Sequence, residues 1–168
     1  MGTAARNSSF KVGDKAVHPA HGVGEVTSIE IREIAGHKKN FYIMKIFENG
    51  MKVMVPTDGA QRAGLRAIIS RKDAGKVLDV LKSDDIAVEA QPWNRRHREY
   101  MEMLTSGSPF KVACVLRDIL RIKTSKELSF GERRILDQAK GLLVRELAIA
   151  RRCSEAKVES DIQSIFCD

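Results

Sequence analysis

Hydrophobic and polar residues alternate along much of the N-terminal part of the chain, the pattern of strands with one buried face. The clearest example consists of Phe41–Phe47 and Met51–Val55, two alternating runs separated by a segment that contains Asn49-Gly50. Asn-Gly is a favoured pair for the type I′ turn of a β-hairpin. Two further strands are predicted, at Asp14–His18 and Glu25–Ile34. Turns are predicted at Gly22-Val23-Gly24, between these strands, and at Gly36-His37, after the second one. The segment up to residue 69 is therefore predicted to form a small antiparallel sheet.

The same alternation predicts which hairpin side chains face the core of the sheet. The inward set comprises Phe41, Ile43, Phe47, Met51, Val53 and Val55, and the outward set comprises Tyr42, Met44, Lys52, Met54 and Pro56. Pro56 has no backbone N–H to donate, so its strand is predicted to be an edge strand. Such an edge, flanked by Met44 and Met54, could accept a strand from another protein. The alternative is that the N-terminal tail or the second domain of this chain covers these apolar side chains.

From Ser70 onward the hydrophobic period changes from two residues to 3.6, which indicates helices. Serines suited to helix N-caps stand at Ser70, Ser108, Ser129 and Ser154. Ser129 and Glu132 have the spacing of a capping box, and Gly107 is suited to end the helix that contains Trp93. On the helix that follows Ser108, the residues predicted to face outward are Lys111, Arg117 and Lys123.

This change of period also predicts the domain organisation. Residues 1–9 are small and polar and form a flexible tail, residues 10–69 form the β domain, and residues 70–168 form a compact all-α domain of about five helices. Thr57–Ile69 is predicted to be a loop, and Ser83–Gln91 an acidic linker between two helices. The predicted fold class is therefore α+β.

The only tryptophan of the chain is predicted to begin an arginine-rich helix. Pro92 is favoured at a helix start, so Trp93 lies at the leading edge of the helix. One helical stripe comprises Trp93, His97, Tyr100 and Leu104, and a different face carries Arg95, Arg98 and Glu102. Either the aromatic residues dock this helix into a core, or the helix contacts nucleic acid. The second interpretation gains support from Arg95, Arg96 and Arg98, because cations at the positive end of a helix dipole are stabilised by a phosphate.

Composition restricts the partners and the compartment. The chain has 168 residues, a formal net charge of +7 and a pI near 9.5, which favours a polyanionic partner such as nucleic acid or a polymerase bound to it. It contains no run of about twenty apolar residues and no secretory signal, so a cytoplasmic protein without a membrane segment is expected. Cys114, Cys153 and Cys167 are odd in number and lack a CxxC spacing, so reduced thiols are expected.

Motifs for catalysis and metal binding are incomplete. Gly59 and Gly64 have the outer spacing of a P-loop, but Leu65-Arg66 follows where lysine and a hydroxyl residue are required. His18 and His21 form at most half of a metal site. The apolar neighbours of Cys114 favour the neutral thiol over the thiolate that a nucleophile needs. We therefore expect no enzymatic activity, no metal and no cofactor.

Several motifs occur together in a characteristic order. They are Phe10-Lys11-Val12-Gly13-Asp14, His18-Pro19 with Gly22-Val23-Gly24, Glu48-Asn49-Gly50, Val55-Pro56, Trp93-Asn94-Arg95-Arg96 and Leu128-Ser129-Phe130-Gly131-Glu132. With this combination the chain, from about Phe10 to Phe166, resembles the CarD/CdnL family of bacterial RNA polymerase-binding transcription factors. It is most similar to the stand-alone members, which lack a basic AT-hook-like tail.

The resemblance implies a Tudor-like N-terminal β-barrel, similar to the polymerase-interacting domain of the transcription-repair coupling factor, that binds the β subunit of RNA polymerase. The matching positions are Arg32, Met44, Met54 and Pro56. It also implies that the helical domain contacts promoter DNA at the upstream edge of the melted region, with Trp93 as a minor-groove wedge. Arg95, Arg96, Arg98 and Arg133 would contact phosphates.

The family's action would be to stabilise promoter open complexes, including those of ribosomal RNA promoters. One copy would suffice, so a monomer associated with the nucleoid through RNA polymerase is expected. His18 and His97 stand where tyrosine is frequent in the family, and Met54 stands where some members carry arginine. An alternative is a KOW-like module that binds RNA or the ribosome, in which Tyr42 and Lys52 would contact the RNA and the helical half would bind protein.

Overall fold

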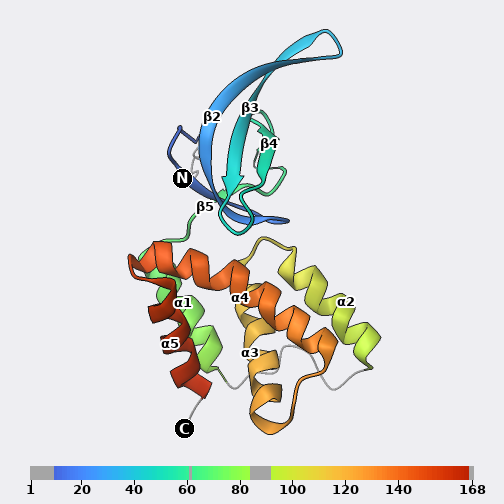
Figure 1. Cartoon of the computed structure of the whole chain (residues 1–168), viewed down its shortest axis with the longest axis vertical. Helices are drawn as coiled ribbons and strands as arrows, with labels where there is room; N and C mark the ends of the chain where they lie inside the picture. The colour runs from blue at the N-terminus through green and yellow to red at the C-terminus, as the bar shows by residue number, and fades with distance from the viewer. Residues whose placement is uncertain (1–9, 61, 84–91, 167–168) are drawn as a thin grey trace, which may run out of the picture. The chain divides into compact units, whose positions relative to one another are not determined.

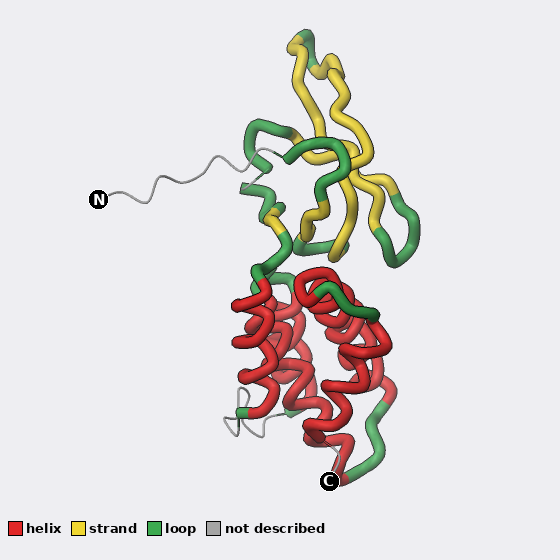
Figure 2. The backbone as a smooth tube through the Cα atoms, turned by 90° about the vertical axis from the view of Figure 1, so that its left-hand side faces the viewer, coloured by secondary structure: helices red, strands yellow, loops and turns green. Residues whose placement is uncertain are grey.

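The computed structural model describes residues 10–60, 62–83 and 92–166. The chain divides into two compact units, one ending at Ile68 and one beginning at Ile69. The first is built of strands and the second of helices, as the yellow and red segments of Figure 2 show. This architecture confirms the predicted α+β class. None of the described helices is long and apolar enough to cross a membrane.

The described part of the first unit contains a five-stranded antiparallel sheet in the order β4-β3-β2-β1-β5. Its strands are β1 (Lys15–His18), β2 (Gly22–Ile34), β3 (His37–Ile46), β4 (Lys52–Pro56) and β5 (Arg66–Ala67). β5 was not predicted, because it consists of two residues inside the predicted loop. The predicted turn at Gly22-Val23-Gly24 is wrong, since these residues belong to β2. A Cβ on Gly24 would lie 2.8 Å from the Lys45 carbonyl oxygen, so this glycine permits close strand contact and does not make a turn.

The two hairpin connections differ from each other in length and conformation. Ala35-Gly36 joins β2 to β3 with φ values of 52° and 80°, as a two-residue type I′ turn requires. At the β3–β4 connection, Gly50 has a positive φ of 69°, whereas Asn49 does not. The predicted type I′ turn at Asn49-Gly50 is therefore wrong. Four residues, 47–50, connect Ile46 to Met51, whose carbonyl accepts a hydrogen bond from the Ile46 N–H at 2.8 Å.

This longer connection places Tyr42 and Met44, predicted to face outward, in the core of the sheet, while Phe41 and Ile43, predicted to face inward, are buried on the other face of β3. The predicted inward set pairs Phe47 with Met51, which needs a three-residue connection, and one added residue turns β3 over relative to β4. Met44 therefore pairs with Val53 and faces the core with a fully buried side chain. Tyr42 also faces the core, where its hydroxyl accepts a hydrogen bond from the Phe10 N–H at 3.1 Å. The prediction that Tyr42 and Met44 face outward is wrong, whereas the predicted directions of Val55 and Met54 are confirmed.

The second unit contains α1 (Arg71–Lys82), α2 (Trp93–Leu104), α3 (Pro109–Ser125), α4 (Phe130–Arg151) and α5 (Glu155–Phe166), which are labelled in Figure 1. The four predicted serine caps are confirmed, because each serine side chain accepts a hydrogen bond from a backbone N–H three residues later. α2 ends at Leu104, three residues before Gly107, and Thr105 is its C-cap. Leu81, Tyr100, Leu116, Ile135 and Leu143 are among the buried residues of one helical core.

Buried charges connect the ends of α1 to the other helices. Arg117, which was predicted to face outward, is buried and donates from Nη1 to the Val80 carbonyl at 3.3 Å. Arg121, one turn later, donates to the Ser83 carbonyl. At the other end of α1, the Glu146 carboxylate accepts a hydrogen bond from the Ile69 N–H at 3.0 Å. Side chains of α3 and α4 thus supply hydrogen-bond partners for backbone groups at both ends of α1.

Candidate functional site

Trp93 is the first residue of α2, and Pro92 precedes it as the N-cap. Its side chain is half-buried and packs against the helical core. The indole contacts the start of α4 so closely that a Cβ on Gly131 would lie 2.7 Å from Trp93 Cζ2 and 3.1 Å from Cε2. Only a residue without a side chain leaves room for the ring in this position. The ring thus packs on the core, as the first interpretation of this helix predicts, and it remains partly accessible, so contact with nucleic acid stays a prediction.

Arg96 lies between the two aromatic side chains of α2. Its guanidinium carbon is 5.5 Å from the centroid of the Trp93 ring and 5.6 Å from that of Tyr100, within the range of cation–π contacts. Nη2 is 3.4 Å from the Tyr100 hydroxyl and 3.7 Å from Glu132 Oε2. With 17% of its side chain exposed, Arg96 is held within the protein. Arg96 therefore fixes the neighbouring rings.

Glu132 links this arrangement to the N-terminus of α4. It forms the predicted capping box, accepting from the Ser129 N–H at 3.0 Å while its own N–H donates to the Ser129 hydroxyl at 3.2 Å. Burial alone raises the pKa of Glu132, but hydrogen bonding to Ser129 and the positive charges of Lys126 and Arg96 outweigh it and lower the pKa. Glu132 is therefore an anion that supports Arg96. We call Trp93, Arg96, Tyr100, Gly131 and Glu132 the Trp93 cluster.

Three of the predicted DNA-contacting arginines are exposed beside this cluster. Arg95 and Arg98 are exposed and lie outside the stripe of α2 that packs on the helical core, as predicted. Arg133, two residues after Gly131, is exposed and donates to Glu127 Oε1 at 3.1 Å. The first turn of α2 contains no acidic residue and no side-chain cap, so its free N–H groups and these cations together favour an anion.

Sequence analysis missed two residues of this surface. Phe130 is 77% exposed at the first position of α4, with the Arg134 guanidinium 5.9 Å from its ring centroid. Its place directly after the predicted N-cap Ser129 did not indicate exposure, because Trp93 and Pro109 also begin helices and are half-buried and buried, respectively. Gly131 carried no signal in the sequence either, since its role depends on a contact between α2 and α4.

The predicted polymerase-contacting residues lie in the other unit. Sheet register places Met54 beside Ile43 and Pro56 beside Phe41, on the face opposite Tyr42 and Met44. Ile43 and Phe41 are buried, whereas Met54 is exposed. Arg32, on the same face of β2, is exposed and paired with Glu30 at 2.7 Å. Met44, by contrast, belongs to the buried core and is not available on this surface. The structure thus brings Arg32, Met54 and Pro56 to one face and removes Met44 from it.

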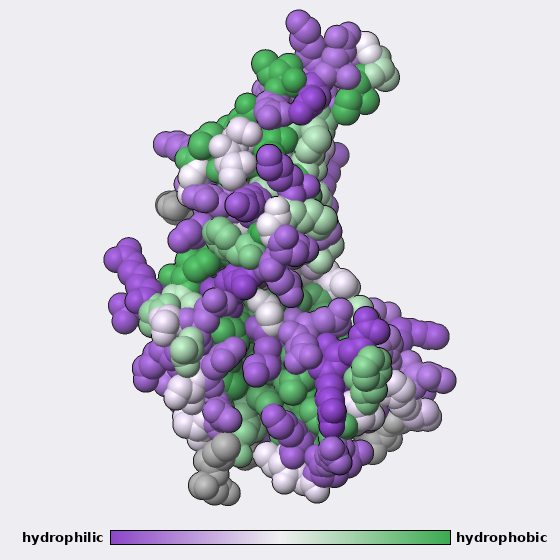
Figure 3. Space-filling model, in the orientation of Figure 1, coloured by the Kyte–Doolittle hydropathy of each residue, from purple (hydrophilic) through white to green (hydrophobic). Residues whose placement is uncertain are grey.

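The β2–β3 hairpin adds a further apolar side chain to this face. Ile34 follows Arg32 by two residues and is 50% exposed. In Figure 3, hydrophobic and hydrophilic side chains are mixed at the end of this hairpin, which forms the upper part of the view. We call Arg32, Ile34, Met54 and Pro56 the β4-side face. Ile34 follows Ser28, Glu30 and Arg32 at every second position, and these polar residues did not indicate an apolar side chain on this face.

Groups with possible metal chemistry are sparse. The His18 and His21 rings lie 4.8 Å apart, and His18 Nδ1 accepts a hydrogen bond from the Ala20 N–H. Burial, followed by the neighbouring His21, lowers the pKa of His18. Among residues 10–60, 62–83 and 92–166, no three His, Cys, Asp or Glu side chains are grouped so as to hold a metal ion. Cys114 and Cys153 are half-buried, and Cys167 lies outside the described residues.

Comparison with known proteins gives consistent assignments for both units. Residues 10–69 match the family model described as CarD-like/TRCF RID domain, and residues 76–163 match that of the CarD C-terminal domain. The putative transcription factor YdeB of Bacillus subtilis (strain 168) is 26% identical over 151 residues, covering 90% of this chain and 98% of that protein.

Two solved structures from Myxococcus xanthus each match part of this chain. CdnLNt is 54% identical, with 38% of this chain and 89% of that chain covered and a TM-score of 0.32. The 72-residue N-terminal domain of CarD, solved by NMR in solution, is 39% identical, with 35% and 79% covered and a TM-score of 0.31. Because the two family models together match both units over most of the chain, this protein belongs to the CarD/CdnL family of transcription factors.

Proposed function

We propose that this protein binds the β subunit of RNA polymerase through the β4-side face and stabilises promoter open complexes through the Trp93 cluster. DNA would be contacted in the minor groove, at the upstream edge of the transcription bubble. The observation that carries this proposal is the position of Trp93, a large ring fixed at a helix start beside exposed arginines. Membership of a transcription factor family supports the same reading.

The polymerase contact is inferred from an edge strand. β4 is paired on one side, to β3, and stands at the end of the sheet order. Pro56 has no N–H and Met54 is 46% exposed, so the strand presents an apolar surface beside backbone groups that can pair with another chain. Arg32 supplies one charge to the same face. A β subunit strand added at β4 would use these features together.

The DNA contact divides into positioning and wedging. Arg95, Arg98 and Arg133 can bind phosphates, which supplies affinity without sequence choice. Trp93 supplies the apolar group that inserts beside an unstacked base step. Phe130 is also apolar and exposed, and it precedes Gly131, which contacts the Trp93 ring. Arg96 is assigned a different role from that expected, because its guanidinium is engaged by Glu132 and the two rings.

The proposed mechanism makes and breaks no covalent bond. A factor that binds the open complex more tightly than the closed complex shifts their equilibrium by the difference between the two binding free energies. Unstacking one base step costs a few kcal/mol, and an inserted ring that holds the step open offsets part of this cost. Promoters with short-lived open complexes, such as ribosomal RNA promoters, are where such a contribution has the largest effect. One copy of the chain supplies both contacts.

The test compares open-complex lifetimes on a ribosomal RNA promoter with no factor, with the protein and with Trp93→Ala. The protein should lengthen the lifetime, and Trp93→Ala should lose most of this effect while still binding the isolated β subunit. Met54→Ala should show the opposite pattern, with weakened β-subunit binding and retained affinity for forked DNA. Equal lifetimes with the protein and with Trp93→Ala would exclude the wedge, and no effect of the protein at all would exclude the proposed function.

The KOW-like alternative loses its main residue in this structure. Tyr42 was the aromatic side chain expected to stack on RNA, and it is buried in the core of the sheet. Lys52 alone offers charge without a stacking surface.

A further inference from the structure

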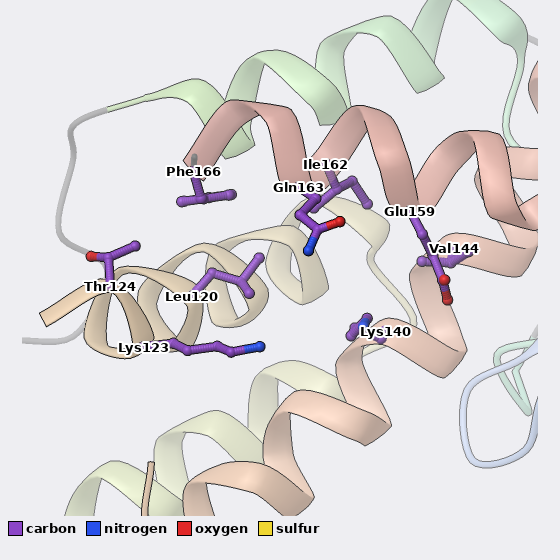
Figure 4. A pocket seen from close by; sticks show the side chains of 9 residues that line it. All are labelled: Leu120, Lys123, Thr124, Lys140, Val144, Glu159, Ile162, Gln163 and Phe166. Atoms are coloured by element: carbon purple, nitrogen blue, oxygen red, sulfur yellow. The ribbon is translucent and has the colours of Figure 1, made fainter. Parts of the chain in front are cut away.

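A groove opens between α3, α4 and α5, away from every residue of the Trp93 cluster. Its volume is about 410 Å³, within the range of about 300–1,000 Å³ typical of small-molecule sites. The lining residues are Leu120, Lys123, Thr124, Lys140, Val144, Glu159, Ile162, Gln163 and Phe166. Figure 4 shows that these side chains come from all three helices and converge on one space. We call this space the α3–α5 groove.

The groove combines an apolar floor with a charged rim. Val144 and Ile162 are buried, and Leu120 and Phe166 are half-buried beside them. Such a surface favours an aliphatic or aromatic ligand group through the hydrophobic effect. Lys123 is exposed and Lys140 half-buried at the rim, and Gln163 adds an amide that can donate a hydrogen bond.

The two lysines are available to a ligand. Among the residues that the structure describes, neither Lys123 nor Lys140 forms an ion pair or a side-chain hydrogen bond. Glu159 is the single acidic lining residue, and it lies at the opposite end of the groove from Lys123 in Figure 4. The lining therefore carries a net charge of +1 from two lysines and one glutamate. This balance fits one negative charge placed between the two lysines.

We propose that the α3–α5 groove binds a small amphiphilic monoanion, a carboxylate attached to an apolar chain of medium length. The carboxylate lies between Lys123 and Lys140, and the chain covers Val144, Ile162 and Phe166. A nucleic-acid phosphate matches the lysines but leaves the apolar floor uncovered, so it is a poorer fit. This binding activity is independent of the polymerase and DNA contacts, because it uses none of their residues.

The experiment titrates the full-length protein with sodium decanoate, below its micellar concentration, while methyl NMR signals of Val144 and Ile162 are followed. These signals should shift in a saturable manner, and octanoate should bind more weakly than decanoate by about fourfold for each buried methylene removed. The double variant Lys123→Gln/Lys140→Gln should bind decanoate about tenfold more weakly, as loss of charge-assisted hydrogen bonds predicts. Lys111→Gln, on the exposed side of α3, is the matched control and should bind like the unsubstituted protein.

Three results would overturn the proposal. Unshifted Val144 and Ile162 signals at saturating decanoate would mean that the groove does not take such a ligand. Equal affinity of the double lysine variant would show binding to apolar surface without recognition of the anion. Binding of an acidic amphipathic peptide in place of decanoate would identify the groove as a protein-docking site instead. The lysines are on the surface, so the double variant is expected to fold, and far-UV circular dichroism checks this.

Discussion

Replacement of Gly131 by alanine tests whether the position of Trp93 matters for function. The added Cβ would lie 2.7 Å from Trp93 Cζ2, whereas carbon atoms in contact prefer about 3.5–4.0 Å. The indole must therefore move by about 1 Å. Gly131 has no positive φ, so alanine suits the α4 backbone and improves its helix propensity by at most about 1 kcal/mol. Overpacking against Trp93 opposes this with about 1–3 kcal/mol.

The half-buried ring can relieve the clash by turning outward, so we expect Gly131→Ala to fold with an unfolding free energy within about 2 kcal/mol of the original. The displaced ring should insert less well beside the unstacked step. A loss of about 1.4 kcal/mol in this contact would shorten the open-complex lifetime about tenfold. Trp93 is the only tryptophan, so its fluorescence emission reports the movement directly and should shift to longer wavelength.

Gly75→Ala is the matched control. Gly75 also lies within a helix, α1, but nothing is found within 4 Å of its added Cβ. This variant should gain about 0.5–1 kcal/mol of stability and leave both the emission and the lifetime unchanged. If Gly131→Ala shifts the emission but preserves the lifetime, the position of the ring is irrelevant and the reasoning fails. If neither changes, Gly131 does not determine the position of Trp93.

Three further predictions concern the fold. Because the pKa of Glu132 is lowered in the folded protein, its charge stabilises the fold above the ordinary glutamate pKa, and this contribution is lost as the pH falls through the lower folded value. Urea denaturation should show Glu132→Gln less stable by about 1–2 kcal/mol at pH 7, with the difference shrinking as the pH falls below the ordinary glutamate pKa, and a difference that does not change with pH would contradict this. Arg117→Met should lose about 3 kcal/mol in the same measurement, since it leaves the Val80 carbonyl without its guanidinium donor, whereas Lys111→Met should change stability by less than about 0.5 kcal/mol. Met44→Ala should cost about 2–5 kcal/mol and Met54→Ala less than about 1 kcal/mol, and similar losses would refute the observed register.

Features that depend on neighbouring residues alone could be predicted from the sequence. The caps at Ser70, Ser108, Ser129 and Ser154 require only a serine and backbone N–H groups in the next turn, so local sequence determines them. The same holds for the exposed positions of Arg95 and Arg98 on α2. The change from period two to period 3.6 likewise marked the change from strands to helices.

The faces of β3 could not be predicted in this way, because they depend on the length of one connection. Three residues between the strands make Met44 an outward residue, and four make it a core residue. Burial of Arg117 is a similar case, since its partner is a carbonyl at the end of a different helix. Helical periodicity predicts which side of a helix faces away from its apolar stripe. It does not show that the end of another helix packs against that side.

The assignment of Arg96 follows from the same limit and changes the account of the site. By sequence, Arg95, Arg96 and Arg98 are equivalent cations at one helix start. In the fold, Arg96 contacts Trp93, Tyr100 and a carboxylate that belongs to the capping box of α4. A ring already fixed by such contacts loses less conformational freedom on insertion into DNA than a mobile one, so more of its contact energy remains for the open complex. Ser129 and Glu132, which cap α4, therefore serve the proposed DNA contact without touching DNA, and a substitution at Glu132 should reduce open-complex lifetime through the orientation of Trp93.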